Sequence, residues 1–341
     1  RSLVGSEMCI RDRFYAVRNI TSIEIPEGVE ALGTNKSSSA FGTCYALKSI
    51  KLPSTLKTIW NSTFYNCGLE TVEIPEGTTF IGKNAFNHCQ KLTTVTLPST
   101  LDSIDDGVFG DCIALTTIKG AMAGVRTIGE EAFFGCPLTE FTVPAACETI
   151  GSRAFSKTKI AKFNVAAGNA NFKVIDEALY TADKSLLIAF PPESATTTLA
   201  VADGCRGIQG GAFQGAKVTK VTLPESVKEV GDGAFFYATH VTNLVLPSKV
   251  TKVAPYLTAG TNVANTNIWG NDITRIGDFA LYNLSDIDRL TIPSQVTYIG
   301  TKAMAGMTGL TRITAKPTTV PLLGHDVWAG VEQKEVELAA A

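Results

Sequence analysis

Apolar and polar positions repeat along this chain with a step of 22 or 23 residues. The segments that begin at Leu69, Leu92 and Leu115 read LETVEIPEGTTFIGKNAFNHCQK, LTTVTLPSTLDSIDDGVFGDCIA and LTTIKGAMAGVRTIGEEAFFGCP. A fixed period of this length is typical of a solenoid, because one coil cannot bury its apolar residues alone and stacked neighbours share a core. Further copies begin at Leu47, Leu138, Ile160, Val218, Val241, Ile287 and Leu310.

The first half of each copy predicts a short strand. In the copy from Leu69, Val72 and Ile74 face the core, while Thr71 and Glu73 alternate outward, as the period of two along a strand requires. A proline then ends the strand, because it has no amide hydrogen for the ladder. Prolines occupy this phase at Pro26, Pro53, Pro75, Pro98, Pro144, Pro224, Pro247 and Pro293.

The second half of each copy predicts a return to the core and a turn. Ile81 is the returning apolar residue, and Gly82 is expected to permit a tight backbone turn. A short helical or irregular turn follows, with a phenylalanine that fills the space between coils. These phenylalanines are Phe64, Phe86, Phe109, Phe133, Phe155, Phe213 and Phe235, and we expect Phe279 and Met304 to continue the column.

The repeated pattern L-x-x-[IV]-x-[IL]-P followed by I-G-x-x-A-F resembles the BspA-like leucine-rich repeat family of bacterial surface proteins. The resemblance covers most of the chain. It implies a leucine-rich repeat solenoid, or horseshoe, with short parallel β-strands on one face and short helical or irregular turns on the other. It also implies export to the cell surface or secretion, with a role in adhesion or protein binding.

The period divides the chain into segments of one continuous solenoid domain. Residues 2–13, SLVGSEMCIRDR, read as a translated sequencing adapter, so we expect 1–13 to lie outside the fold and the natural N-terminus to be missing. The remaining segments are the N-terminal repeats at 14–165, an irregular coil with a β-hairpin at 166–197, the C-terminal repeats at 198–331 and a tail at 332–341.

Two stretches break the period. Between Asn171 and Pro192, two apolar runs flank the polar residues 181–184, which predicts a β-hairpin. The resembled family carries a similar insert, which favours a structural variant of one coil. The second stretch, Pro255 to Gly270, lacks a clean strand, and Trp269 there is expected to fill the imperfect coil, with a surface anchor as the alternative.

Composition and charge limit the class of partner. The chain of 341 residues is 45% hydrophobic, with 30 basic and 32 acidic residues and a formal net charge of -2. Nucleic acids and anionic membranes attract concentrated lysine and arginine, so we expect neither as a partner. Membrane insertion is also not expected, because no apolar run approaches the roughly 20 residues of a membrane span.

Five cysteines form a column three residues after the repeat phenylalanine: Cys44, Cys67, Cys89, Cys112 and Cys136. Later copies place Thr158, Ala216 and Ala238 at this phase, so we expect free, buried thiols that act as small apolar groups. A disulfide between adjacent coils, about 4.8 Å apart, stays an alternative. Zinc is disfavoured, because the sequence has no C-x-x-C and one ligand per coil does not converge.

The sequence carries none of the common catalytic or phosphate-binding motifs. It lacks H-E-x-x-H, G-x-S-x-G, G-x-x-x-x-G-K-[ST] and G-x-G-x-x-G. Asp105, Asp106 and Asp111 lack the spacing of a calcium loop. We therefore predict a protein that is not an enzyme and has no cofactor or metal.

The outward strand positions form the candidate partner-binding face. They are rich in threonine, mixed in charge and free of aromatic rings. Extended solenoid faces of this kind suit protein recognition, and the hypothesis is a non-enzymatic cell-surface or secreted module whose ligand is a protein, such as a host extracellular-matrix or plasma protein. A glycan-binding surface protein and a passive spacer are the alternatives. The candidate residues are Lys51, Thr71, Glu73, Thr94, Thr96, Thr117, Lys119, Glu140, Thr142, Lys220, Thr222, Asn243, Arg289 and Thr291.

Overall fold

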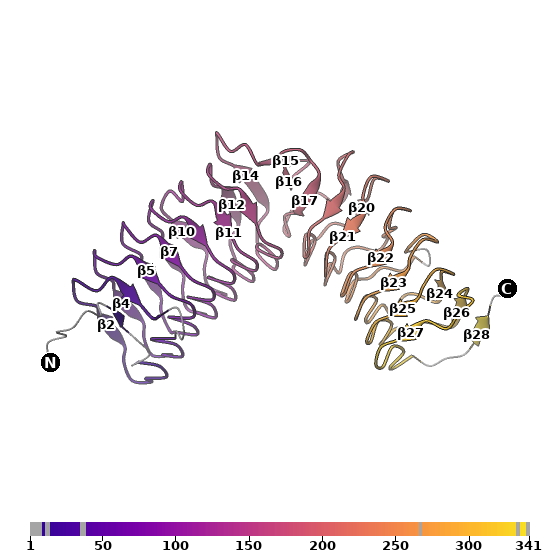
Figure 1. Ribbon diagram of the computed structural model, residues 1–341, viewed down its shortest axis with the longest axis horizontal. Helices are drawn as coiled ribbons and strands as arrows, with labels where there is room; N and C mark the ends of the chain where they lie inside the picture. Colours follow the sequence, from indigo (N-terminus) through magenta and orange to yellow (C-terminus); the bar gives the residue numbers. More distant parts are fainter. Residues whose placement is uncertain (1–8, 11–13, 35–38, 266–267, 332–334, 339–341) are drawn as a thin grey trace. The chain divides into compact units, whose positions relative to one another are not determined.

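The fold is a parallel β-solenoid of stacked coils of about 23 residues, seen in a computed structural model that describes residues 9–10, 14–34, 39–265, 268–331 and 335–338 (Figure 1). Within these ranges every regular element is a strand, and turns connect them. The turns expected to be helical or irregular are therefore irregular. The chain falls into two compact units, Arg1–Phe172 and Lys173–Ala341, which are described separately. The division lies inside the coil that the sequence marked as irregular.

In the first unit, the predicted strands form three parallel ladders. The ladders are β2-β4, β6-β8-β10 and β12-β14. The strands are β2 (Ser22–Glu24), β4 (Ser49–Lys51), β6 (Thr71–Glu73), β8 (Thr94–Thr96), β10 (Thr117–Lys119), β12 (Glu140–Val143) and β14 (Lys162–Val165).

A second sheet runs through the same coils, and the sequence pattern did not predict it. It is formed by two-residue strands that end on the isoleucine or leucine of the second half-coil, and all seven pair in parallel in chain order. They are β1 (Cys9–Ile10), β3 (Ala31–Leu32), β5 (Thr58–Ile59), β7 (Phe80–Ile81), β9 (Ser103–Ile104), β11 (Thr127–Ile128) and β13 (Thr149–Ile150).

Strand β1 lies within residues 1–13, which were expected outside the fold. Cys9 and Ile10 pair with Ala31 and Leu32 of β3, because an extended segment beside an edge strand satisfies its unpaired backbone groups. Residues 1–8 and 11–13 of that segment, and residues 332–334 and 339–341 of the predicted tail, lie outside the described residues.

In the second unit the same two ladders recur with one interruption. The strand pairs of the first half-coil are β18 (Thr198–Ala200) with β20 (Lys220–Thr222), and β24 (Arg289–Ile292) with β26 (Arg312–Ala315) and β28 (Glu335–Leu338). The other strands are β15 (Phe172–Ile175), β16 (Ala178–Thr181), β17 (Leu186–Ala189), β19 (Gly207–Ile208), β21 (Glu229–Val230), β22 (Lys252–Val253), β23 (Arg275–Ile276), β25 (Tyr298–Ile299) and β27 (Leu322–Leu323). They form the sheets β15-β16-β17-β19-β21 and β22-β23-β25-β27.

The predicted β-hairpin is confirmed. Strands β16 and β17 pair antiparallel, and β17 then continues in parallel with β19. The hairpin therefore replaces one half-coil and carries the sheet on to the next repeat.

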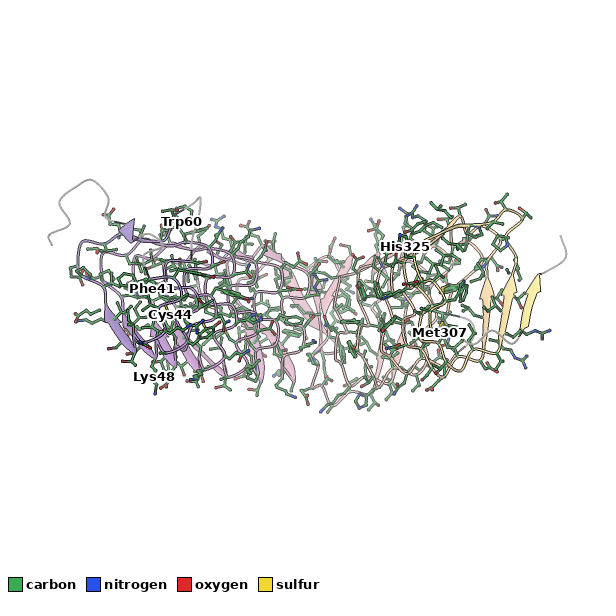
Figure 2. All side chains as sticks on the ribbon, turned by 90° about the horizontal axis from the view of Figure 1, so that it is seen from below. Phe41, Cys44, Lys48, Trp60, Met307 and His325 are labelled. Carbon is green, nitrogen blue, oxygen red and sulfur yellow. The ribbon has the colours of Figure 1, made fainter. Side chains whose placement is uncertain are left out.

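The core of each unit is a stack of phenylalanine rings. In the first unit Phe41, Phe64, Phe86, Phe109 and Phe133 are fully buried, and successive ring centroids lie 5.1–5.7 Å apart. Phe41 and Cys44 lie inside the coil, whereas Lys48 and Trp60 lie at opposite edges (Figure 2). In the second unit Phe190, Phe213 and Phe235 stack in the same way.

The expectation that Phe279 continues this column is wrong, whereas Met304 does. Met304 is fully buried. In the repeat G-x-x-A-F, Gly277 and Ala280 place Leu281 at the phenylalanine phase, and Leu281 is fully buried. Phe279 lies two residues earlier, half-buried in the turn with a φ of 54°.

Candidate binding face

The outward residues of the first unit lie in register on neighbouring strands. Thr71, Thr94 and Thr117 are cross-strand partners on β6, β8 and β10. Glu73, Thr96 and Lys119 form the next row, and buried Val72 and Val95 alternate with them. The strand spacing of about 4.8 Å therefore places six of the predicted residues on one surface.

The other three predicted residues of this unit lie on separate ladders. Lys51 on β4 pairs with Glu24 of β2, and the two form an ion pair in which both side chains are exposed. The hydrogen bond and charge of Glu24 raise the pKa of Lys51. Glu140 and Thr142 lie on β12, beside Lys162 and Asn164 of β14. A partner that binds Lys51 competes with Glu24. Because an exposed ion pair adds little stability, this competition costs the partner little binding energy.

In the second unit the predicted residues fall into two groups. Lys220 and Thr222 lie on β20, and Asn243 of the next coil forms an isolated bridge with Lys220. Arg289 and Thr291 lie on β24, in register with Arg312 and Thr314 of β26. The irregular coil at residues 255–270 separates the groups, so the fourteen candidate residues do not share one uninterrupted ladder.

The ladder stops at the irregular coil because a side chain takes the place of a strand. The Asn265 side-chain nitrogen Nδ2 donates to the Leu244 carbonyl oxygen at 2.9 Å, and the Asn265 side-chain oxygen Oδ1 accepts from the Leu244 backbone amide at 3.0 Å. Next to this pair of hydrogen bonds, Val245 is 53% exposed. Trp269 fills the core of the same coil, as expected, because it is 8% exposed and its indole Nε1 donates to the Thr291 carbonyl oxygen.

A hollow of about 270 Å³ opens on the strand face at this interruption. Val245 and Pro247 supply apolar surface, and Lys220, Thr222 and Asn243 supply polar groups. Lys220 forms no ion pair with any residue that the structure describes. The complete lining is Lys220, Val221, Thr222, Leu223, Glu225, Asn243, Val245, Leu246 and Pro247.

Three of the nine lining residues, Lys220, Thr222 and Asn243, were among the sequence candidates, and Val245 and Glu225 are two of the six that were not. The signal for Val245 was an apolar residue in a row that is otherwise mostly polar, next to a coil without a clean strand motif. Glu225 accepts hydrogen bonds from the Ser248 amide at 3.2 Å and from its hydroxyl at 2.7 Å. Its carboxylate is thereby oriented by the following coil, which leaves Lys220 as the group that can meet a partner's negative charge.

The cysteine column is buried, as predicted, and its thiols are free. Each thiol donates to the carbonyl oxygen of the phenylalanine one coil earlier, and the Sγ to oxygen distances run from 2.9 to 3.1 Å. Burial raises the pKa of the Cys89 thiol to about 12 and also raises that of Cys112. The Cys89 and Cys112 thiols therefore remain protonated and pack as apolar groups.

The part of the chain that the structure describes contains no group of three or more metal-ligating side chains. The same residues form no helix that is long and apolar enough to cross a membrane.

The two-ladder coil is shared with a known family. A family model described as BspA type leucine-rich repeat region, in six copies, matches residues 9–123, 120–202 and 206–330. The chain belongs to the BspA-type leucine-rich repeat family. Among curated proteins, none matches this chain.

Solved structures agree with this BspA-type fold. A leucine-rich cell surface protein from Faecalibacterium prausnitzii has a TM-score of 0.74 and 27% identity, over 98% of this chain and 83% of that one. The pneumococcal vaccine antigen PcpA has a TM-score of 0.70 and 20% identity, over 99% of this chain and 82% of that one. Proteins built on leucine-rich repeats of this type serve as binding or structural modules and are typically not catalytic.

Proposed function

We propose that this BspA-type protein is a non-enzymatic module that captures a protein ligand through its strand face. The observation that carries the proposal is the hollow lined by residues from 220–225 and 243–247, where the strand ladder is interrupted. An exposed valine lies there among polar neighbours. Protein interfaces concentrate their binding energy in such places, where an apolar group enters a pocket and polar groups at its edge fix the orientation.

The contacts around the hollow define the chemistry of the ligand. Val245 and Pro247 line the hollow with apolar groups that suit an aliphatic side chain, and the Lys220 ammonium suits a carboxylate. A ligand segment with an aliphatic residue next to an aspartate or glutamate fits both requirements. Thr222 and Asn243 offer hydrogen bonds beside them.

The proposed setting is the cell surface or the medium around the cell. The similar Faecalibacterium protein is described as a leucine-rich cell surface protein, and this supports the same location here. A host extracellular-matrix or plasma protein is the class of ligand that such a surface would meet. We therefore propose adhesion, with the strand face as its contact surface.

The test is binding of the chain to immobilised extracellular-matrix and plasma proteins, with glycans on the same array. The variant Lys220→Glu/Val245→Glu replaces the basic group of the hollow, whose lining also contains Glu225, with a carboxylate and adds a second carboxylate to its apolar part. We expect at least one saturable protein ligand whose affinity falls about tenfold or more in this variant, which corresponds to about 1.4 kcal/mol.

The matched control is Lys228→Glu/Lys252→Glu, which changes exposed residues of the same unit on or beside the second sheet. This control should leave the affinity unchanged. A correctly folded chain that binds no protein on the array would favour the passive spacer. A ligand that is lost equally in both variants would move the binding surface away from the strand face.

A further inference from the structure

Five aromatic rings gather on the turns of the second unit, away from the strand face. Phe236 and Tyr237 belong to one coil, Tyr256 to the next, and Phe279 and Tyr282 to the third. Tyr256 and Phe279 stack with centroids 4.8 Å apart, while Phe236 meets Tyr256 edge to face at 5.6 Å. Phe236 and Tyr237, and likewise Phe279 and Tyr282, also meet edge to face. We name these five residues the aromatic edge.

The aromatic edge is not part of the core. Tyr237 is 50% exposed and Tyr256 is 40% exposed, and the other three rings are half-buried. In the first unit, the turn positions equivalent to Tyr256 and Tyr237 carry mostly polar residues or glycine. Those at the Tyr256 phase include Ser62, Asn84, Gly107, Glu131 and Arg153, and those at the Tyr237 phase are Ala16, Thr43, Asn66, His88, Asp111, Gly135 and Lys157.

Three of these aromatic residues have a backbone conformation that is unfavourable for bulky side chains. Tyr237, Tyr256 and Phe279 have φ values of 52°, 56° and 54°, in the left-handed region that glycine and asparagine adopt more easily. Bulky residues there cost folding free energy, and exposed rings regain little of it by burial. Strain that the fold does not need is a reason to look for function.

The rings offer an amphipathic surface. Tyr237 lies over Gly260 of the next coil, because a Cβ added there would lie 3.0 Å from its Cδ1 and Cε1 atoms. The ring is thus supported by backbone on one side and half exposed. Lys302 Nζ lies 6.0 Å from the Phe279 centroid and caps that end of the stack. His240 and Asn283 are exposed polar neighbours in the same coils.

We propose that the aromatic edge binds a short, uncharged oligosaccharide. The C–H groups of a sugar ring carry partial positive charge and pack on the negative face of an aromatic ring. Tyr237, which is 50% exposed and has Gly260 on one side only, offers this contact, whereas Tyr256 and Phe279 stack on each other and support it. Tyrosine hydroxyls and neighbouring polar side chains pair with sugar hydroxyls. Rigid tyrosines supply this contact at low entropic cost. The site spans three coils, about 10 Å from the first strand level to the third.

A small ligand fits this surface better than a protein does. A standard protein interface covers about 800 Å² on each partner, whereas this patch consists of two exposed and three half-buried rings. The site is independent of the proposed function, because its residues lie on turns and the hollow lies on strands. Loss of one binding activity should therefore leave the other unchanged.

The test uses the full chain and a panel of uncharged oligosaccharides, namely cello-, xylo-, manno- and galacto-oligosaccharides. Binding is followed by intrinsic fluorescence and by saturation-transfer NMR. The variant is Tyr237→Asn/Tyr256→Asn, because asparagine occupies these phases at Asn66 and Asn84 and tolerates the left-handed backbone. We expect saturable binding of at least one sugar, and we expect its affinity to fall about tenfold or more in this variant.

The matched control is Tyr15→Ala/Tyr45→Ala, two exposed tyrosines of the first unit at 56% and 51% exposure. It should bind sugar as the parent chain does, and so should Lys220→Glu/Val245→Glu. The asparagine variant should also melt no lower than the parent chain, because it relieves strain. Absence of saturable binding across the panel, sugar binding that survives in the asparagine variant, or a clear fall in its melting temperature would each overturn the proposal. Loss of a protein ligand in that variant, without sugar binding by the parent chain, would assign the edge to a protein instead.

Discussion

At the scale of single residues, the glycine that follows the returning isoleucine serves close approach between coils. Gly129 has no left-handed φ, but a Cβ on it would lie 2.4 Å from the Asp106 amide nitrogen. Gly151 stands equally close to Glu130, with a distance of 2.3 Å. The sequence pattern predicted these glycines as turn formers. The left-handed turn residues lie two and six positions later, at Glu131 and Gly135 in the coil of Gly129.

Replacing Gly129 with alanine tests this reading. The added methyl group meets backbone atoms of the preceding coil that cannot move aside, so we expect Gly129→Ala to lower the free energy of unfolding by about 2–3 kcal/mol. The control is Gly168→Ala, where φ is 88° and the space is open, with an expected cost of about 1 kcal/mol. Urea denaturation of both variants gives the comparison. Equal losses would show that conformational freedom, and not close approach, requires the glycine at 129.

At the scale of elements, the hairpin turn between β16 and β17 is held by one carboxylate oxygen. Asp183 Oδ1 accepts hydrogen bonds from the Thr181 hydroxyl at 2.7 Å, the Ser185 amide at 2.9 Å and the Ser185 hydroxyl at 2.8 Å. These bonds, led by that from Thr181, lower the pKa of Asp183 to about 2. The polar tetrapeptide that the sequence marked as a turn thus contains its own anchor.

The hairpin should loosen in acid. Because the pKa of Asp183 is depressed in the folded chain, its contribution is complete above its ordinary value of 3.8 and is lost as the pH falls through about 2. Carbon-13 NMR of the side-chain carboxyl group should show this titration. Asp183→Ala should increase amide exchange at Lys184 and Leu186 already at neutral pH, whereas the parent chain should do so only in acid. A titration near 3.8 would show that these hydrogen bonds do not persist in solution.

At the scale of the whole molecule, each coil is stabilised mainly by its neighbours. The ring of Phe109 stacks between those of Phe86 and Phe133, with centroid distances of 5.6 and 5.7 Å. Each of the two units repeats this arrangement with its own column. The stability of such a chain is approximately a sum of coil and nearest-neighbour terms, so damage to one coil should spread only a short way.

Truncation of one core ring tests this locality. Phe109→Ala leaves a cavity in the middle of the first column, with an expected loss of about 3–5 kcal/mol in its own part of the molecule. Hydrogen exchange should rise in the coils between residues 84 and 155 and stay unchanged between residues 198 and 315. Thr93→Ala, an exposed position of the same unit, is the control. A uniform rise across both units would contradict the nearest-neighbour picture.

Much of the fold followed from the repeat itself. The strand register is an example: Thr71, Thr94 and Thr117 share a phase in the sequence and pair in the structure. The hairpin and the buried Trp269 were predictable for the same reason, because a break in a strict period marks where a coil must differ. The second sheet was not predictable, since two-residue strands are too short to show alternation and form only when neighbouring coils supply partners.

The sequence by itself determined the solenoid, its family and the outward rows, because a fixed period forces equivalent residues into equivalent environments. Only the tertiary structure decided where the face forms a hollow and where the rings gather. The hollow lies where the Asn265 side chain pairs with Leu244 in place of a strand, and the aromatic edge exists because coil stacking brings Phe236, Tyr256 and Phe279 together. Both are contacts between residues about twenty positions apart, and such contacts depend on the packed coils and not on any local pattern.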